Sequence, residues 1–199
     1  MKIRKHFQRF IYLTLCVVII TIACTRQPQQ SNQQVAQKAK QHNAIIFVAD
    51  GLRPDWVNST DTPNLNEIRS NGVTFLNSHS LFPTFTTSNA SAIATGHFLG
   101  DTGDFSNTIK VNNPVKSAKN SLVPYLENNV VLKEVNKQFG ANFLNEQSLL
   151  FTARKAGFST AAVGKIGPVL IQDITLQQGE PTIIFDDDTG TKEGVTLNQ

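Results

Sequence analysis

The sequence predicts an α/β fold with a largely parallel central sheet, and three features carry that prediction. A continuous apolar run at residues 44–49 has the length of a strand and ends at an Asp-Gly pair; unbroken apolarity is typical of a strand covered on both faces. Strand-like and helical segments then alternate along the chain. With 40% hydrophobic and 17% charged residues among its 199, the chain has the composition of a folded protein rather than a disordered one.

The expected helices begin at capping residues and end at glycine. Thr62 is expected to cap a helix that opens at Pro63 and closes at Asn71-Gly72, because Thr favours the N-cap and Pro the first turn. In open α/β sheets the chemistry lies at the carboxyl ends of strands, so Asp50 is expected at the functional edge. The remaining expected elements are helices at residues 86–95, 121–139 and 147–156, strands at 73–76, 159–163 and 182–185, and a segment at 169–174 that fits either state.

The first 23 residues predict an export signal. They hold four basic and no acidic side chains, and residues 10–23 are apolar. This run is too short for a spanning helix, which needs about 20 residues, and it fits the h-region of a secretory signal. Removing the four leader charges from the total of +3 leaves −1 for the rest of the chain. The basic character therefore describes the leader, and no nucleic-acid binding is expected.

The end of the leader predicts a lipid anchor. Thr21-Ile22-Ala23-Cys24 resembles the lipobox that bacterial lipoprotein signal peptidase cuts, with Thr where Leu is usual. Cys24 would then carry the lipid and hold the protein to a membrane, in the periplasm or at the cell surface. The alternatives are an ordinary signal peptide cut near Ala23, an uncleaved anchor, and a cytoplasmic protein. Residues 24–43, rich in Gln, are expected to form a flexible tether before the domain begins at residue 44.

Two residues suggest a chemistry when they are taken together. Alone, Asp50 is typical of an Asp-Gly turn and Thr86 of a helix N-cap. A hydroxyl at a helix N-terminus lies beside free amides and the positive end of the helix dipole, a setting that suits a phosphate. Because a Thr hydroxyl is a poor nucleophile at neutral pH, it needs a base or a metal ion. A strand-end carboxylate such as Asp50 can hold that ion.

Several short motifs, in order and at compatible spacing, resemble those of one known family. Residues 50–55, Asp-Gly-Leu-Arg-Pro-Asp, are similar to its D-G-[FL]-R-x-D opening, and residues 82–86, Phe-Pro-Thr-Phe-Thr, to its F-P-T-x-T, whose second Thr is the nucleophile. Two further short motifs of the same family resemble Thr62-Pro63-Asn64-Leu65 and Ala94-Thr95-Gly96. The family is the type I phosphodiesterase/nucleotide pyrophosphatase group of the alkaline phosphatase superfamily. The likeness is dense over residues 44–107, and several marks together are far more specific than one.

The resemblance implies an alkaline-phosphatase-like α/β sandwich, of which residues 44–199 are the N-terminal, incomplete part. It implies Asp50 as a metal ligand, Thr86 as both ligand and nucleophile, and Asn89 as a donor to the phosphate. Two divalent ions, usually zinc, would assist the attack of Thr86 on phosphorus. The implied substrate is a phosphodiester, a nucleotide pyrophosphate or a phosphomonoester.

Further residues follow from the resemblance less directly. Asn107 is implied as a substrate-binding residue. Gly164-Lys165 is similar to the Gly-Lys of the related sulfatases, in which Lys contacts the anion; the alternative for Lys165 is a solvent-exposed strand end. Thr87 and Ser88 replace the family's usual Phe-Pro after the nucleophile, and the usual His two residues later is also replaced. These departures are expected to change substrate preference.

The lack of histidine after position 97 limits these expectations. The family's other metal ligands are Asp and His residues far downstream, so the chain supplies at best Asp50 and Thr86, part of one metal site. We therefore expect an N-terminal fragment of a phosphoryl hydrolase that binds metal weakly and turns over little alone. Two alternatives stay open, which are a noncatalytic surface lipoprotein with the same fold and a fragment without a function of its own.

Overall fold

The computed structural model describes residues 42–174 and 181–194. Two compact units divide the chain, one up to Val48 and one from Ala49 to Gln199. The predicted signal, Cys24 with its predicted lipid, and nearly all of the predicted tether lie outside the described residues. No helix within the described residues is long and apolar enough to cross a membrane.

The described part of the first unit is an extended segment, residues 42–48, without helix or strand. The prediction of a strand at residues 44–49 is therefore wrong for this structure. Ile45 and Leu76 illustrate the reason, since their side chains are 91% and 95% exposed and both lie in apolar segments that were expected to be strands. A strand is defined by backbone bonds to a neighbour, and neither segment 44–49 nor segment 73–76 is paired in the described structure.

The second unit opens with a short 3₁₀ helix, η1 (Pro54–Trp56), and with α2 (Pro63–Asn71), which begins at Pro63 as expected. Thr62 does not cap α2 with its side chain. Its hydroxyl donates instead to the Trp56 carbonyl at 2.8 Å, which ties α2 to η1. No residue of α2 is buried.

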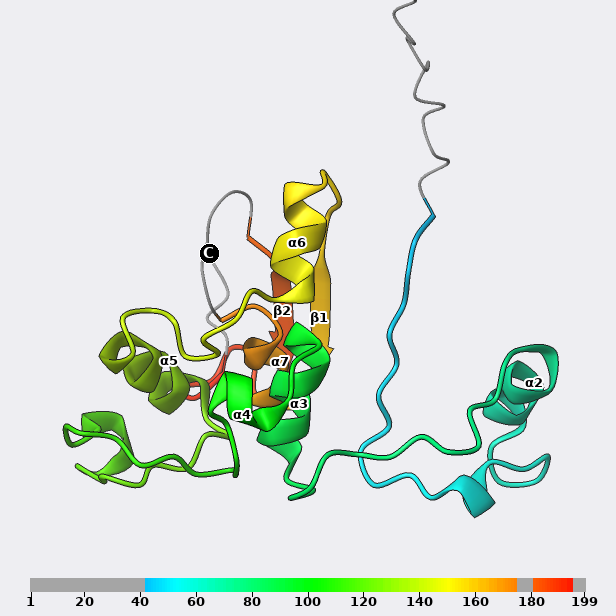
Figure 1. The fold of residues 1–199 in the computed structure, drawn as a ribbon, viewed down its shortest axis with the longest axis horizontal. Helices are drawn as coiled ribbons and strands as arrows, with labels where there is room; N and C mark the ends of the chain where they lie inside the picture. The colour runs from blue at the N-terminus through cyan, green and yellow to red at the C-terminus, as the bar shows by residue number, and fades with distance from the viewer. Residues whose placement is uncertain (1–41, 175–180, 195–199) are drawn as a thin grey trace, which may run out of the picture. The chain divides into compact units, whose positions relative to one another are not determined.

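The packed part of this unit holds five further helices and a parallel two-stranded sheet (Figure 1). In the sheet, β1 (Ala161–Gly164) pairs with β2 (Ile183–Asp186) so that Ala161 lies opposite Ile183. Helix α3 packs against α4, α6 and α7, and α7 also packs against both strands. The helices are α3 (Thr86–Thr95), α4 (Leu99–Thr102), α5 (Asn129–Gln138), α6 (Leu149–Lys155) and α7 (Pro168–Ile171), with a second 3₁₀ turn, η2 (Lys116–Ala118).

Helix α5 begins later than the predicted start at residue 121. Residues 121–126 are committed to other backbone bonds, among them Val111 N to Leu122 O at 3.0 Å and Leu126 N to Asn107 O at 2.8 Å. The helix starts only after Asn128, whose side-chain oxygen accepts from the amides of the second and third helical residues. This is the usual N-cap arrangement, and Asn is among the residues that favour it.

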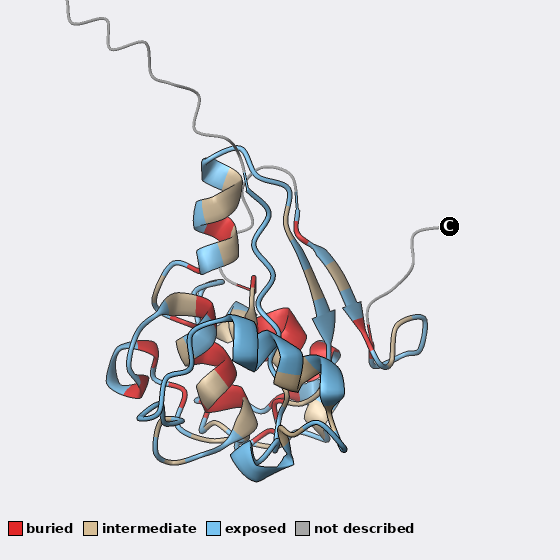
Figure 2. Ribbon diagram, turned by 90° about the vertical axis from the view of Figure 1, so that its right-hand side faces the viewer, coloured by how far each residue is buried: buried red, intermediate tan, exposed pale blue. Residues whose placement is uncertain are grey.

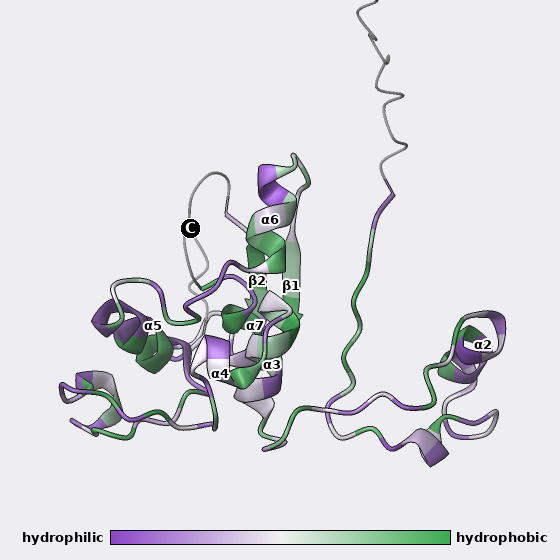
Figure 3. Cartoon of the chain, in the orientation of Figure 1, coloured by the Kyte–Doolittle hydropathy of each residue, from purple (hydrophilic) through white to green (hydrophobic). Residues whose placement is uncertain are grey.

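The core lies where the helices meet (Figure 2). On α5 the apolar residues Val131, Leu132 and Val135 recur at helical spacing and are at most 4% exposed, while the opposite side of the helix is hydrophilic (Figure 3). Burial of one such Leu or Val side chain contributes about 1.5–3 kcal/mol. The sheet is less covered, since Val163 is 78% and Ile183 is 60% exposed. The observed fold is thus α/β with a small parallel sheet, as predicted, and incomplete as a sandwich.

Candidate functional site

Asp50 and Thr86 lie next to each other, although 36 positions separate them in the sequence. The Thr86 hydroxyl donates to Asp50 Oδ2 at 3.4 Å. Asp50 opens a turn in which the Leu52 amide bonds to the Ala49 carbonyl at 3.2 Å. Gly51 has a φ of 75° there, a conformation that favours glycine. The turn thus brings the exposed carboxylate to the hydroxyl of a half-buried Thr.

Thr86 is the first residue of α3, and its hydroxyl is not used to cap the helix. Phe85 is the N-cap residue, with extended backbone angles, and its own side chain does not cap the helix. The amides of the first helical turn have no partners within the helix. They and the helix dipole favour negative charge, so the Thr86 hydroxyl lies at a helix end where an anion would be favoured.

Asn107 is also placed at the first turn of α3. Its side-chain oxygen accepts from the Thr87 amide at 3.0 Å and lies 3.2 Å from the Thr87 hydroxyl. That hydroxyl is also 2.9 Å from the Ser106 carbonyl. The segment after α4 therefore holds the helix directly beside Thr86.

The Asn89 side chain, predicted to donate to a phosphate, bonds to the backbone of the segment before α3. Its side-chain oxygen accepts from the Leu81 amide at 2.8 Å, and its amide nitrogen donates to the carbonyls of Leu81 at 3.3 Å and Phe85 at 3.0 Å. The Asn89 side chain thus supports the loop that leads into α3. Its predicted contact with a phosphate stays a prediction.

Lys165 follows β1 and belongs to a cluster of three polar side chains. Its ammonium group lies 2.7 Å from Glu127 Oε1, and the Tyr125 hydroxyl donates to the other oxygen of the same carboxylate. The hydrogen bond to Glu127 raises the pKa of Lys165 against the opposing effect of burial, and the Asp50 carboxylate raises it further by a smaller amount. The Lys165 charge is therefore stabilised, and Asp50 acts on it electrostatically.

The described residues offer two oxygen donors, Asp50 and Thr86, for a divalent ion of the kind that carboxylates bind. They contain no group of three or more His, Cys, Asp or Glu that could hold a metal. The acidic run that follows β2 is a local turn, in which Asp186 Oδ1 accepts from the Asp188 amide and the Thr189 hydroxyl, each at 3.0 Å. The residues present thus fit part of one metal site and do not account for two.

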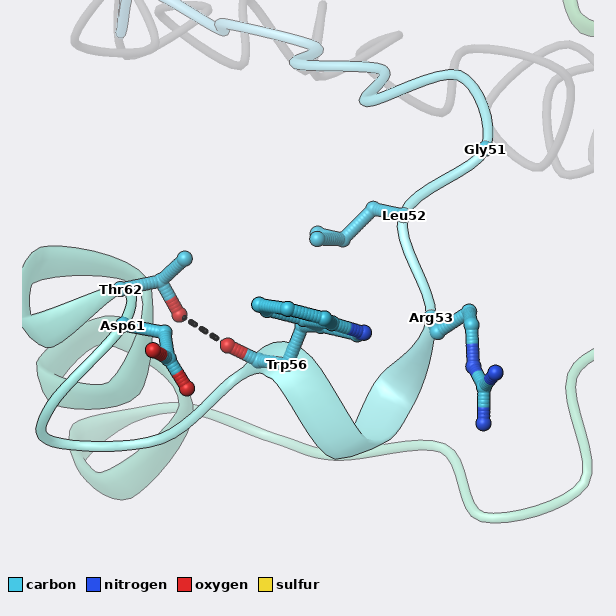
Figure 4. A pocket seen from close by; sticks show the side chains of 6 residues that line it. All are labelled: Gly51, Leu52, Arg53, Trp56, Asp61 and Thr62. Atoms are coloured by element: carbon cyan, nitrogen blue, oxygen red, sulfur yellow. Dashed lines mark hydrogen bonds between the residues drawn. The ribbon is translucent and has the colours of Figure 1, made fainter.

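An open pocket of about 390 Å³ lies directly after Asp50 in the chain. Leu52 and the flat face of the Trp56 indole line it, together with Thr62 (Figure 4). Trp56 is 53% exposed, so it is not a core residue. The Arg53 guanidinium at the rim is paired with the Asp55 carboxylate at 2.8 Å.

Sequence reasoning missed the residues that support this site. Glu127 and Asp104 are carboxylates that contact residues 38 and 13 positions away, Lys165 and Ser91 respectively. No short motif links such pairs, because their contacts form only when the fold is complete. Asp104 does not stand out in the sequence, because the segment around Gly103 also contains Asp101.

Comparison with known proteins identifies the family of this chain. A model of the family "Type I phosphodiesterase / nucleotide pyrophosphatase" matches residues 44–188, most of the chain. Searches of curated proteins and of solved structures found no match. Enzymes of this family are hydrolases that typically depend on divalent metal ions and act on small-molecule phosphoesters. The extent of the match and the α/β architecture together place this chain in the type I phosphodiesterase/nucleotide pyrophosphatase family.

Proposed function

We propose that this chain carries the nucleophile of a metal-dependent phosphoryl hydrolase, with Thr86 attacking phosphorus and Asp50 as its metal-binding partner. The observation that supports the proposal most directly is the 3.4 Å contact between Thr86 Oγ1 and Asp50 Oδ2. A hydroxyl that only capped α3 would bond to the helix amides, whereas this one donates to a carboxylate from a distant turn.

In the proposed reaction, Thr86 Oγ1 forms a bond to phosphorus while the bond to the leaving ester oxygen breaks, and water later releases the phosphoryl group from Thr86. The hydroxyl proton leaves along the hydrogen bond that points to Asp50 Oδ2. A divalent ion bound by Asp50 and Thr86 would lower the pKa of the hydroxyl and offset charge on the phosphoryl oxygens. Zinc is our proposed ion, on the strength of the family resemblance alone.

Three groups of this chain are proposed to bind the phosphoryl oxygens. The amides of the first turn of α3 that Asn107 does not occupy provide hydrogen-bond donors. Asn107 lies at that turn, and it suits the role better than Asn89, whose donors are occupied by backbone carbonyls. Lys165, oriented by Glu127, provides a positive charge for the anion.

Hydrolysis of bis(p-nitrophenyl) phosphate by the full chain with added Zn²⁺ tests the proposal. Thr86→Ala is expected to abolish turnover, and Thr86→Ser to keep a measurable part of it, because Ser retains the hydroxyl. Thr95→Ala is the matched control, since Thr95 lies at the other end of α3 and its hydroxyl bonds only to local backbone. Wild-type turnover above background that Thr86→Ala leaves unchanged would disprove the nucleophile assignment.

The noncatalytic alternative makes a different prediction in the same assay. A binding protein with this site would bind inorganic phosphate in calorimetry without hydrolysing the ester, and Thr86→Ala would weaken that binding while turnover stayed at background. We favour the hydrolase, because a binding site does not require the Thr86 hydroxyl to be directed at a carboxylate.

We also propose that Cys24 anchors the protein as a lipoprotein in the periplasm or at the cell surface. The support is the small residue before Cys24 at the end of a basic, then apolar, leader. Expression in bacteria with a labelled fatty acid is expected to label the wild-type chain in the membrane fraction and to leave Cys24→Ser unlabelled. Labelling of both chains, or of neither, would disprove the anchor.

A further inference from the structure

A carboxylate is buried against the helix that carries Thr86. Asp104 is 1% exposed, and its Oδ2 accepts a 2.6 Å hydrogen bond from the hydroxyl of Ser91, which is fully buried on α3. Helix α3 itself contains no charged residue. The Asp104 carboxylate is therefore a specific polar contact in an otherwise uncharged packing surface, since buried charges are costly unless they are well paired.

The segment that begins at Asp104 holds α3 at two points one helical turn apart. Ser91 is bonded to Asp104, and Thr87, four residues earlier, is bonded to Asn107 and contacts Ser106. Residues four apart lie on the same face of a helix. Residues 104–107 thus run along this face towards the N-terminus of α3, and the second attachment point is the neighbour of Thr86.

The same surface contains hydrogen-bonding capacity that is not used. Within the described residues, Ser88 Oγ is buried without a hydrogen-bond partner, and Asp104 Oδ1 makes no hydrogen bond of ordinary geometry, although the Ser106 amide and the Thr87 hydroxyl lie near enough to lower the pKa of the carboxyl. Ser88 lies one residue after Thr87 and three before Ser91, next to the two attachment points. Burial raises the pKa of Asp104 to about 6, against the lowering effects of the Ser91 hydroxyl, the Ser106 amide and the Thr87 hydroxyl. The group therefore changes its charge within an ordinary working pH range.

We propose that Asp104 is a positioning residue for Thr86, which aligns the first turn of α3 through its bond to Ser91 and through the segment that holds Thr87. The proposal rests on the proposed function of Thr86. It adds that the competence of the site depends on whether the Asp104 carboxylate is protonated, because a protonated and an ionised carboxyl group hold the Ser91 hydroxyl differently.

The charged groups near this surface are few. Helix α4 contributes Asp101, whose Oδ2 lies 3.7 Å from His97 Nδ1. The other ring nitrogen of His97, Nε2, lies 3.7 Å from Glu146 Oε2. On α6, Arg154 is engaged with Asp173. Only hydroxyls, an amide and burial act on the pKa of Asp104, so its titration is separable from these ion pairs.

The test follows the backbone amide of Thr87 by NMR in the ¹⁵N-labelled full chain from pH 5 to pH 8, which requires no turnover. In the wild type this amide is expected to titrate with a midpoint near 6, and in Asp104→Asn the titration is expected to disappear. His97→Gln should keep the wild-type midpoint. A flat Thr87 signal in the wild type, or an unchanged titration in Asp104→Asn, would overturn the proposal.

Two matched serine variants keep the test decisive if Asp104→Asn does not fold. Ser91→Ala removes a hydrogen bond that lowers the pKa of Asp104, so the midpoint should move above that of the wild type. Ser88→Ala removes an equally buried hydroxyl on the same helix that has no partner, so the midpoint should stay. Equal midpoints in the two variants would refute the coupling through Ser91.

A kinetic measurement then connects the coupling to the reaction. In the hydrolysis assay, Asp104→Asn is expected to remove the inflection of kcat near pH 6 and to leave KM essentially unchanged, because Asp104 does not touch the substrate. An inflection that persists in Asp104→Asn would refute the positioning role. The two proposals can fail separately. Turnover that Thr86→Ala leaves unchanged would disprove the nucleophile assignment, whereas the amide titration reports on Asp104 alone.

Discussion

Replacing Asp104 with Asn is predicted to remove a pH dependence of stability that is expected for the wild-type chain between pH 5 and pH 8. Burial raises the pKa of Asp104 from 3.8 to about 6, so the folded state holds the proton more tightly than the unfolded state does. The stability that protonation contributes is complete below pH 3.8 and is lost as the pH rises through about 6. This sign is opposite to that of a salt-bridged Asp.

The magnitude follows from the two pKa values. The pKa of Asp104 is about 2.2 higher in the folded than in the unfolded state. At 1.36 kcal/mol per pKa unit, full protonation therefore contributes about 3 kcal/mol to the free energy of unfolding. Of this, about 1.4 kcal/mol is still present at pH 5 and almost none at pH 8. The amide group introduced by Asp104→Asn is neutral throughout and has nearly the shape of the carboxyl group. The variant should therefore lose this gradient of about 1.4 kcal/mol and be more stable than the wild type at pH 8.

Urea denaturation followed by circular dichroism at pH 5, 6, 7 and 8 measures the effect, with the slope of unfolding free energy against urea checked for constancy. Ser88→Ala is the control for a neutral change in the same surface, and it should keep the wild-type gradient. If wild type and Asp104→Asn showed the same gradient, or if the variant were the less stable one at pH 8, the assignment of a raised pKa to this carboxyl would be wrong.

Two further predictions concern stability away from Asp104. Asp173→Asn should destabilise the chain by about 3–5 kcal/mol, because it leaves the Arg154 guanidinium buried without its charge partner; thermal and urea unfolding would measure the loss, and an unchanged midpoint would contradict the importance of the pair. Gly167→Ala should cost more than about 1–2 kcal/mol, since φ is 85° and the new Cβ would lie 2.6 Å from the Glu127 Cα; a variant as stable as the wild type would show that this turn is more adaptable than the structure indicates.

The helices were more predictable from the sequence than the strands, for a physical reason. Helix α3 occupies residues 86–95 as predicted, and α2 begins at Pro63, because helix signals such as caps, Pro and Gly act within a few residues. The segments 44–49 and 73–76 have the composition of strands, yet they are unpaired in the described structure. Composition indicates the tendency to form a strand, and only a neighbouring strand makes one.

The same distinction applies to the candidate site. The order of the motifs pointed to Asp50 and Thr86, and the structure places Thr86 Oγ1 3.4 Å from Asp50 Oδ2. The catalytic and metal-binding roles of these residues remain predictions. The partners of Lys165 and of α3, Glu127 and Asp104, are long-range contacts that leave no local pattern in the sequence. Asn89 lies within a motif, yet the motif did not indicate that its side chain would bond to the preceding loop.

The exposed apolar segment before Asp50 has a practical consequence. Residues 44–49, Ala-Ile-Ile-Phe-Val-Ala, carry no charge and no proline, and the extended part up to Val48 leaves Ile45, Ile46 and Phe47 between 62% and 91% exposed. Uncharged stretches of this length and composition template cross-β assembly between molecules. Purified chain should therefore be prone to form fibrils or amorphous precipitate at high concentration, and the single substitution Ile46→Lys would act as a gatekeeper against it.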